Sequence, residues 1–228
     1  MDTKVKEYVN KELGSKCGAI IFEIGAHYGE DTLDMLRVFD SPKIYCFEPD
    51  PRSLNFLHKY FSANSIDAEI VDVALFNKNG ESDFLMSYAP YPEGVALPEK
   101  YQWIDENDYR SFRLNNAGGS SLKKGHEAVK DAETVSVQTM RLDTWAQENN
   151  ITHVDFIWVD VQGAEREVVE GGEQTLKNTS FVWIEYGETK YEGAMTRGQT
   201  IEFFSRIGFE YVMSRDNNML FRNKNGNG

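Results

Sequence analysis

Carboxylate side chains stand within or directly after three apolar segments of the sequence. They are Glu23, Glu48 and Asp160. In sheets of parallel strands, ligands bind at the carboxyl ends of the strands, so these acids are expected at one edge of such a sheet. Glu48 follows Gly25 by 23 residues, a placement that suits a carboxylate accepting hydrogen bonds from both hydroxyls of a ribose. The spacing predicts a nucleoside-binding site.

A loop with two glycines, residues 23–29, follows the first apolar segment and precedes a helical pattern. Gly25 allows a tight turn, and Gly29 allows the helix to pack closely on its strand. The dinucleotide fingerprint Gly-x-Gly-x-x-Gly is absent because Ala26 and His27 occupy its middle. Nearby acids would repel a pyrophosphate, whereas S-adenosylmethionine (SAM) has no phosphate and carries a sulfonium and an ammonium group. The loop therefore favours SAM over NAD; the simpler alternative is an α/β fold whose acids only cap helices.

Apolar strands alternate with amphipathic helices along most of the chain, which predicts a doubly wound α/β sheet within one domain spanning residues 1–228. The strand at 81–88 is expected to pair back on the preceding strand as a hairpin. Strands are expected at 19–24, 43–47, 68–75, 81–88, 134–140, 154–161 and 181–186, with a terminal hairpin at 209–213 and 219–222. Helices are expected at 30–39, 51–61, 143–148, 163–178 and 196–207, the fourth bent at Gly171-Gly172.

A lid-like insertion at about residues 88–118 interrupts this alternation. It holds three of the six prolines and several aromatic side chains that follow neither a strand nor a helix period. A long irregular loop in a compact domain is typically a lid or binding loop, so its aromatic rings are expected to contact an acceptor. The candidate substrate-binding residues are Tyr101, Trp103, Ser121 and His126. The alternative is that the rings pack the insertion onto the sheet or form a dimer contact.

Several motifs occur in an order that resembles a known family. The match is carried by residues 22–29 with Thr32, 47–49, 74–80, 119–122, 135–143, 155–165 and 182–185. The most diagnostic is 155–165, Asp-Phe-Ile-Trp-Val-Asp-Val-Gln-Gly-Ala-Glu. Over roughly residues 19–187 the chain is similar to the FkbM-type SAM-dependent methyltransferases, although asparagine is commoner in that family where His27 stands. No motif covers the insertion or the terminal hairpin.

This resemblance implies an α/β class I methyltransferase fold, a Rossmann-like, mostly parallel seven-stranded sheet with a C-terminal antiparallel hairpin. Family members methylate hydroxyl oxygens of sugars and natural products, so the resemblance also implies a SAM-dependent O-methyltransferase with a small-molecule or glycan acceptor. The expected cofactor-binding residues are Glu23, Gly25, Ala26, His27, Tyr28, Gly29, Thr32, Glu48, Pro49, Asp72, Val73, Ala74, Asp160 and Gln162.

Asp160 and Glu165 are the candidate catalytic carboxylates. An alcohol is a poor nucleophile until it loses its proton, so O-methylation benefits from a general base or from a metal that acidifies the hydroxyl. Asp160 ends a buried strand, where a charge needs a partner. Glu165 stands five residues further on and is alternatively an acid that stabilises the start of a helix. A divalent cation of the magnesium type, held through Asp160 and Glu185, is a further alternative that the sequence does not favour.

The composition argues against several classes of function. Lysine and arginine total 24 against 37 acids, and the net charge of −13 repels a polyanion, so no nucleic-acid partner is expected. No apolar run approaches the ~18 residues of a membrane span, so no membrane partner is expected either. Two cysteines and a polar N-terminus without a signal-peptide pattern predict a reducing, cytoplasmic location. An NAD-type oxidoreductase and a non-catalytic SAM-binding protein remain as rival functions.

Overall fold

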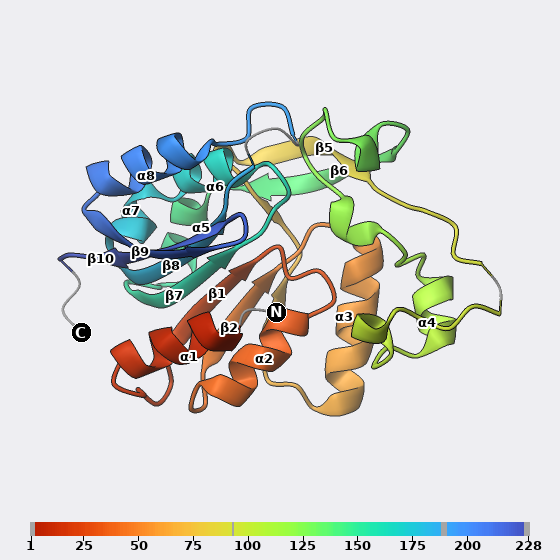
Figure 1. Cartoon of the computed structure of the whole chain (residues 1–228), viewed down its shortest axis with the longest axis horizontal. Helices are drawn as coiled ribbons and strands as arrows, with labels where there is room; N and C mark the ends of the chain where they lie inside the picture. Colours follow the sequence, from red (N-terminus) through yellow and green to blue (C-terminus); the bar gives the residue numbers. More distant parts are fainter. Residues whose placement is uncertain (1–2, 93, 188–190, 226–228) are drawn as a thin grey trace.

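A seven-stranded sheet forms the centre of the computed structural model, which describes residues 3–92, 94–187 and 191–225 (Figure 1). The strand order is β3-β2-β1-β7-β8-β10-β9; the first five of these strands are parallel, and β10 is antiparallel to both of its neighbours. The prediction of a mostly parallel class I sheet that ends in an antiparallel hairpin is confirmed. The bounds are β1 Ile20–Ile24, β2 Lys43–Phe47, β3 Glu69–Val71, β7 Val154–Val159, β8 Thr179–Glu185, β9 Phe209–Arg215 and β10 Asn218–Asn223.

Helices cover both faces of this sheet, which explains why its central strands β1, β7 and β8 are mostly apolar and are buried along nearly their whole length. Helices α1 to α3 pack on one face, where Leu57 of α3 joins the same apolar cluster as Ile21 of β1. Helices α5 to α8 pack on the other, where Trp145 of α5 joins Phe22, the next residue of β1. The bounds are α1 Thr3–Glu12, α2 Glu30–Val38, α3 Pro51–Asn64, α5 Leu142–Glu148, α6 Glu165–Gly171, α7 Glu173–Lys177 and α8 Arg197–Arg206 (Figure 1).

The helix expected at 163–178 is divided between α6 and α7, at the two glycines that the sequence indicated. A Cβ atom on Gly171 would lie 2.1 Å from the backbone oxygen of Phe76, so the end of α6 lies too close to the segment around Phe76 for any side chain at this position. Within the described ranges, no helix is both long enough and apolar enough to cross a bilayer.

The prediction of one strand over 68–75 is wrong, because the chain leaves the central sheet at the exposed Asp72. β3 ends at Val71, and β4 (Ala74–Leu75) belongs to a second, three-stranded sheet with the order β4-β6-β5. The predicted pairing of 81–88 with the preceding strand is also wrong. β5 (Gly80–Met86) pairs antiparallel with β6 (Glu133–Met140). β6 also pairs with β4, so it lies between β4 and β5 and keeps these two strands from pairing with each other.

The insertion, residues 88–118, is folded around a small apolar cluster of its own. It contains the short helices η1 (Glu99–Tyr101) and α4 (Glu106–Ser111), and η2 (Ala117–Gly119) closes it. Leu97, Ile104 and Tyr109 pack in it against Tyr28 and Phe56 from the main fold. The segment therefore lies beside α3, as Figure 1 shows, and most of its aromatic rings have packing partners within the protein.

Candidate active site

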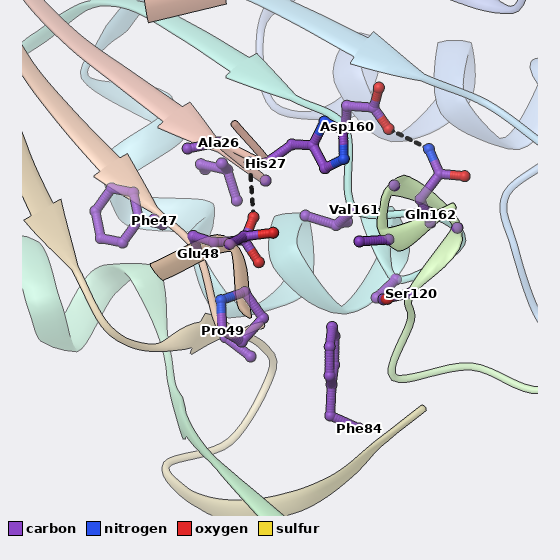
Figure 2. A pocket seen from close by; sticks show the side chains of 18 of the residues that line it. Ala26, His27, Phe47, Glu48, Pro49, Phe84, Ser120, Asp160, Val161 and Gln162 are labelled. Atoms are coloured by element: carbon purple, nitrogen blue, oxygen red, sulfur yellow. Dashed lines mark hydrogen bonds between the residues drawn. The ribbon is translucent and has the colours of Figure 1, made fainter. Parts of the chain in front are cut away.

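A cavity of about 540 Å³ lies at the carboxyl ends of β1, β2 and β7 (Figure 2). It is lined by the loops that follow these strands, by Val73 and strand β4 at the edge of the second sheet, and by Phe84 of β5. Residues 100–101 and 116–120, within and directly after the insertion, complete the lining. β1 has β2 on one side and β7 on the other, so this is the point at which the order of the parallel sheet reverses. Open α/β sheets bind their ligands at such a point.

Close contact between two loops fixes the floor of the cavity. The backbone of Gly25 has φ +91°, and a Cβ atom there would lie 1.8 Å from the backbone oxygen of Asp160. The N–H groups of Gly25 and Ala26 both donate to the carbonyl oxygen of Phe47, at 2.9 and 3.0 Å. These contacts bring the ends of three strands together and leave no room for a side chain at residue 25.

The Glu48 carboxylate lines the cavity and is almost fully buried. Its Oε2 accepts a hydrogen bond from the N–H of His27 at 2.7 Å (Figure 2). Its Oε1 accepts one from the N–H of Asp50 at 2.8 Å. Burial, with the neighbouring Asp50 carboxylate, raises the pKa of Glu48 to about 7. Each oxygen keeps a second lone pair, so the carboxylate can accept two further hydrogen bonds from a ligand.

Five of the predicted cofactor-binding residues lie outside the cavity lining. Glu23 and Thr32 are buried beneath the loop, where the Thr32 hydroxyl donates to Glu23 and burial raises the pKa of Glu23 to about 8. Tyr28 is buried and donates its hydroxyl to the carbonyl of Leu114, which connects the loop to the insertion. The remaining two are Gly29, which packs against Phe61, and the exposed Asp72.

The other predicted cofactor-binding residues come together at the cavity: Gly25, Ala26, His27, Glu48, Pro49, Val73, Ala74, Asp160 and Gln162. Gln162 has φ +53° and donates its side-chain N–H₂ to Asp160 Oδ1 at 2.5 Å (Figure 2). The same group donates to Glu185 Oε2 at 3.3 Å. The Gln162 amide therefore lies between Asp160 and Glu185, the two carboxylates that the sequence offered as ligands of a divalent cation. Among the residues that the structure describes, no group of three or more His, Cys, Asp or Glu side chains is arranged to hold a metal ion.

Glu165, the second catalytic candidate, lies behind the loop rather than in the cavity lining. Its Oε1 accepts hydrogen bonds from the N–H groups of Val161 and Gly163, at 3.3 and 3.1 Å. Burial raises the pKa of Glu165 to about 7. These contacts hold the loop that carries Asp160, so the position of Glu165 fits a supporting carboxylate at the start of α6.

Only Tyr101, of the four predicted acceptor contacts, is part of the cavity lining. Trp103 packs against Tyr60 of α3, with ring centroids 5.0 Å apart. Ser121 is buried and donates to the backbone oxygen of Gln162 at 2.6 Å. The remaining candidate, His126, stacks on Tyr191 at 4.8 Å. The structure thus gives three of these side chains protein partners outside the cavity.

Phe84, Lys100 and Asn116 are among the cavity residues that were not identified from the sequence. Phe84 reaches the cavity from the second sheet, through a pairing of β5 with β6 that no local sequence pattern indicates. Lys100 and Asn116 lie in the insertion, which no motif covers.

The charges around the cavity fit a ligand that carries positive charge. The lining includes the carboxylates of Glu30, Asp31, Glu48 and Asp160 against the amine of Lys100, and Lys6 of α1 pairs with Asp31 from behind. SAM has no phosphate, and its sulfonium and ammonium groups outnumber its one carboxylate. The buried Glu48, with lone pairs for two hydroxyl donors, provides the group that a ribose needs. The residues present therefore fit SAM, and they would oppose the pyrophosphate of a dinucleotide.

The chain matches known methyltransferases in sequence. Residues 23–211 match the family described as "Methyltransferase FkbM domain". The 2-O-methyltransferase NoeI of Sinorhizobium fredii is 31% identical over 182 residues, which cover 77% of this chain and 67% of that protein. Methyltransferase 1 of Beauveria bassiana is 24% identical over 174 residues, covering 72% of this chain and 66% of that protein. This chain thus spans about two thirds of these relatives.

Solved structures share the fold. The methyltransferase FkbM of Methylobacillus flagellatus KT has a TM-score of 0.50 and 11% identity, over 90% of this chain and 43% of that one. The magnesium protoporphyrin IX methyltransferase of Synechocystis PCC 6803, solved with bound SAM, has a TM-score of 0.52 and 5% identity, over 97% of this chain and 77% of that one. At these identities the likeness concerns the class I methyltransferase fold alone. The family match over residues 23–211 goes further, and with it the chain belongs to the FkbM family of SAM-dependent methyltransferases.

Proposed function

We propose that this protein transfers the methyl group of SAM to a hydroxyl oxygen of a glycan or a similar polyhydroxylated acceptor. The observation that carries the proposal is the cavity at the strand ends, in which the buried Glu48 and the cavity-lining Asp160 come from neighbouring loops. SAM supplies an electrophilic methyl group on a cationic sulfur. The carboxylates around the cavity stabilise such a cation.

The cofactor half of the proposed site is formed by the loops after β1 and β2. Glu48 would accept hydrogen bonds from the ribose hydroxyls, and Gly25 lets the backbone approach the ligand closely. Val73 and Ala74 line the apolar part of the cavity, together with Phe84. Asp160 lies on the loop after β7, where its charge would act on the positive groups of SAM.

The acceptor half is formed by the insertion, which we treat as part of the same methyltransferase domain. Tyr101, Lys100 and Asn116 give this side of the cavity an aromatic ring, a cation and an amide. Such a mixture suits a sugar, whose C–H faces pack on aromatic rings while its hydroxyls bond to polar groups. The name of the relative NoeI, a 2-O-methyltransferase, supports oxygen as the atom that is methylated.

The test is the formation of S-adenosylhomocysteine from SAM in the presence of methyl glycosides, free sugars and catechol. We expect turnover with at least one glycoside, and a methyl ether as the second product. Glu48→Ala should weaken SAM binding by ~1.5–3 kcal/mol, the usual cost of losing hydrogen bonds to a charged group. Glu69→Ala, on the exposed surface of β3, is the matched control and should bind SAM normally. SAM binding without turnover on any acceptor would instead favour a non-catalytic SAM-binding protein.

A further inference from the structure

His27 presents an unsatisfied nitrogen at the active site. Its side chain lines the cavity, and its Nε2 atom is buried with no hydrogen-bond partner in the part of the chain that the structure describes. Buried polar atoms normally have partners, so an orphaned one in a ligand site indicates a partner that arrives with the ligand.

The backbone of His27 is held in an unusual conformation. Its φ of +53° lies in the left-handed region, which a residue with a side chain adopts at a cost. The Glu48 carboxylate fixes its N–H at 2.7 Å, and its ring stacks on Tyr28 with centroids 3.4 Å apart and planes at 30°. Strained residues held by several contacts are concentrated at functional sites. The contacts therefore determine where the imidazole points.

Glu30, in the first turn of α2, orients this imidazole. His27 Nδ1 lies 3.3 Å from Glu30 Oε2, and the same oxygen accepts the N–H of Tyr28 at 3.2 Å. Burial alone would raise the pKa of Glu30, but the neighbouring His27 and nearby backbone N–H groups outweigh it and lower this pKa. An ionised Glu30 favours the tautomer with the proton on Nδ1, which leaves the lone pair on Nε2.

A glycine packs over the face of this ring. A Cβ atom on Gly118, in the turn η2, would lie 3.0 Å from Nε2, 3.2 Å from Cε1 and 3.6 Å from Cδ2, which is a position above the ring and not in its plane. Gly118 therefore does not occupy the in-plane direction of the Nε2 lone pair. Gly118 and Gly119 also line the cavity. Because Nε2 is buried, an acceptor oxygen reaches its lone pair only when neighbouring groups such as this turn move.

We propose that His27, oriented by Glu30, is the base that accepts the proton of the acceptor hydroxyl, and that the acceptor oxygen binds beside Nε2 in the plane of the imidazole. This inference rests on the proposed O-methyltransferase function. In the step, the hydroxyl proton passes to Nε2 while an oxygen lone pair forms the bond to the methyl carbon. The C–S bond of SAM breaks, and its electron pair remains on sulfur. The products are a methyl ether, S-adenosylhomocysteine and an imidazolium that returns its proton to solvent.

The surroundings of His27 stabilise the imidazolium that this step forms. The carboxylate of Glu30 contacts the ring directly, and further acids lie around the cavity, so the developing positive charge meets fixed negative charge. Asp160 is less suited to be the base, because its Oδ1 already accepts the Gln162 amide and an imidazole is better matched to proton abstraction near neutral pH. The titratable and charged groups around the ring, from each neighbouring element, are Tyr28, Glu30, Asp31, Glu48, Lys100, Tyr101 and Asp160.

The experiment compares His27→Asn with His58→Asn, a matched control on the exposed side of α3. Asparagine tolerates the left-handed backbone at residue 27, so the variant should fold. With an acceptor found in the glycoside panel, we expect kcat of His27→Asn to fall ~10²–10⁴-fold, the usual loss for a general base. SAM affinity by calorimetry should change far less than kcat, and a cooperative thermal transition should show that the variant is folded. The acidic limb of the pH–kcat profile should disappear in this variant and persist in the control.

Two measurements separate this role from a structural one. Glu30→Gln keeps the imidazole but removes the charge beside it, so the acidic limb of the pH–kcat profile, measured at saturating SAM, should move to lower pH. In protein with ¹⁵N-labelled histidine, adding S-adenosylhomocysteine and the accepted glycoside together should shift the Nε2 resonance of His27 and leave that of His58 in place.

The outcomes distinguish failure of this inference from failure of the proposed function. If the wild-type protein turns over but His27→Asn keeps its kcat and its acidic limb, the inference is overturned and the proposed function stands. A loss of SAM affinity that matches the loss of rate would make His27 a cofactor contact and overturn its role as base. An unmoved acidic limb in Glu30→Gln would overturn the orienting role. A wild-type protein without turnover on any acceptor would refute the proposed function, and this inference with it.

Discussion

Glu48 gives SAM binding a pH dependence whose size follows from its burial. The pKa of Glu48 in the ligand-free protein is about 7. Ribose hydroxyls donate hydrogen bonds, so they bind the ionised carboxylate, and a protonated Glu48 must first release its proton. SAM binding should therefore weaken as the pH falls through 7.

The magnitude comes from the fraction of Glu48 that is ionised. With a pKa of about 7, this fraction is about 9% at pH 6 and about 91% at pH 8. The Kd for SAM should accordingly be about tenfold higher at pH 6 than at pH 8, or about 1.4 kcal/mol weaker in binding free energy. Isothermal titration calorimetry in buffers of different ionisation enthalpy measures both this change and the number of protons released.

The comparison that isolates Glu48 is the variant Glu48→Gln. Each oxygen of Glu48 accepts a backbone N–H, so a glutamine amide would turn its own N–H₂ toward one of these donors and bind SAM more weakly. This variant should lack the tenfold step, whereas Glu69→Gln on the exposed surface should keep it. The amino group of SAM titrates equally in all of these proteins, so it does not affect the comparison. A Kd that is constant from pH 6 to 8, or an equal step in Glu48→Gln, would refute the reasoning.

The remaining predictions concern stability and packing. Because burial raises the pKa of Glu23 to about 8 from an ordinary value of 4.5, the native state binds this proton more tightly than the unfolded state, and the free energy of unfolding should fall as the pH rises from 6 to 8. Thermal unfolding without ligand should show this fall, and a Glu23→Gln variant with an equal fall would contradict it. Gly25→Ala should abolish SAM binding or folding, because its Cβ would lie 1.8 Å from a backbone oxygen; normal calorimetric affinity would argue against the close contact. Trp103→Ala should lower the free energy of unfolding by roughly 2 kcal/mol or more without changing the acceptor KM, since Trp103 packs on α3. Tyr101→Ala should instead raise the acceptor KM. If Trp103→Ala raised the acceptor KM and Tyr101→Ala only lowered the free energy of unfolding, Trp103 would be the acceptor contact and Tyr101 the packing residue.

Much of the fold could be predicted because apolar strands and amphipathic helices repeat in a regular order. The strand predicted at 68–75 failed for a local reason, since both halves are apolar and the turn at Asp72 has no glycine or proline to mark it. The hairpin predicted at 81–88 failed for a long-range reason. β5 is bonded to β6, which is separated from it in sequence by the whole insertion, and no local pattern indicates such a pairing.

The helices of the insertion escaped prediction because their periodicity is too short to detect. α4 has six residues, of which Tyr109 is the buried one, so no apolar stripe could form. The aromatic rings of the insertion were expected to contact a ligand because their spacing followed neither a strand nor a helix period. Most of them instead pack on Tyr28 and α3, since a cluster built from short turns buries rings without needing a regular spacing.

For the site, spacing in the sequence located the loops but not the role of each side chain. Glu48 and Asp160 reach the cavity because each follows a parallel strand, and the alternation of strands with helices along the chain predicts parallel strands. Glu23 and Thr32 belong to the same motif and yet lie beneath it, because Glu23 is part of β1 and Thr32 part of α2, and the two side chains meet in the buried space between strand and helix. His27 differs from both groups, since its proposed role depends on a missing hydrogen bond and on Glu30 three residues later. A sequence can show that a histidine stands in a binding loop, but only the folded chain shows that one of its nitrogens is buried without a hydrogen-bond partner among the described residues.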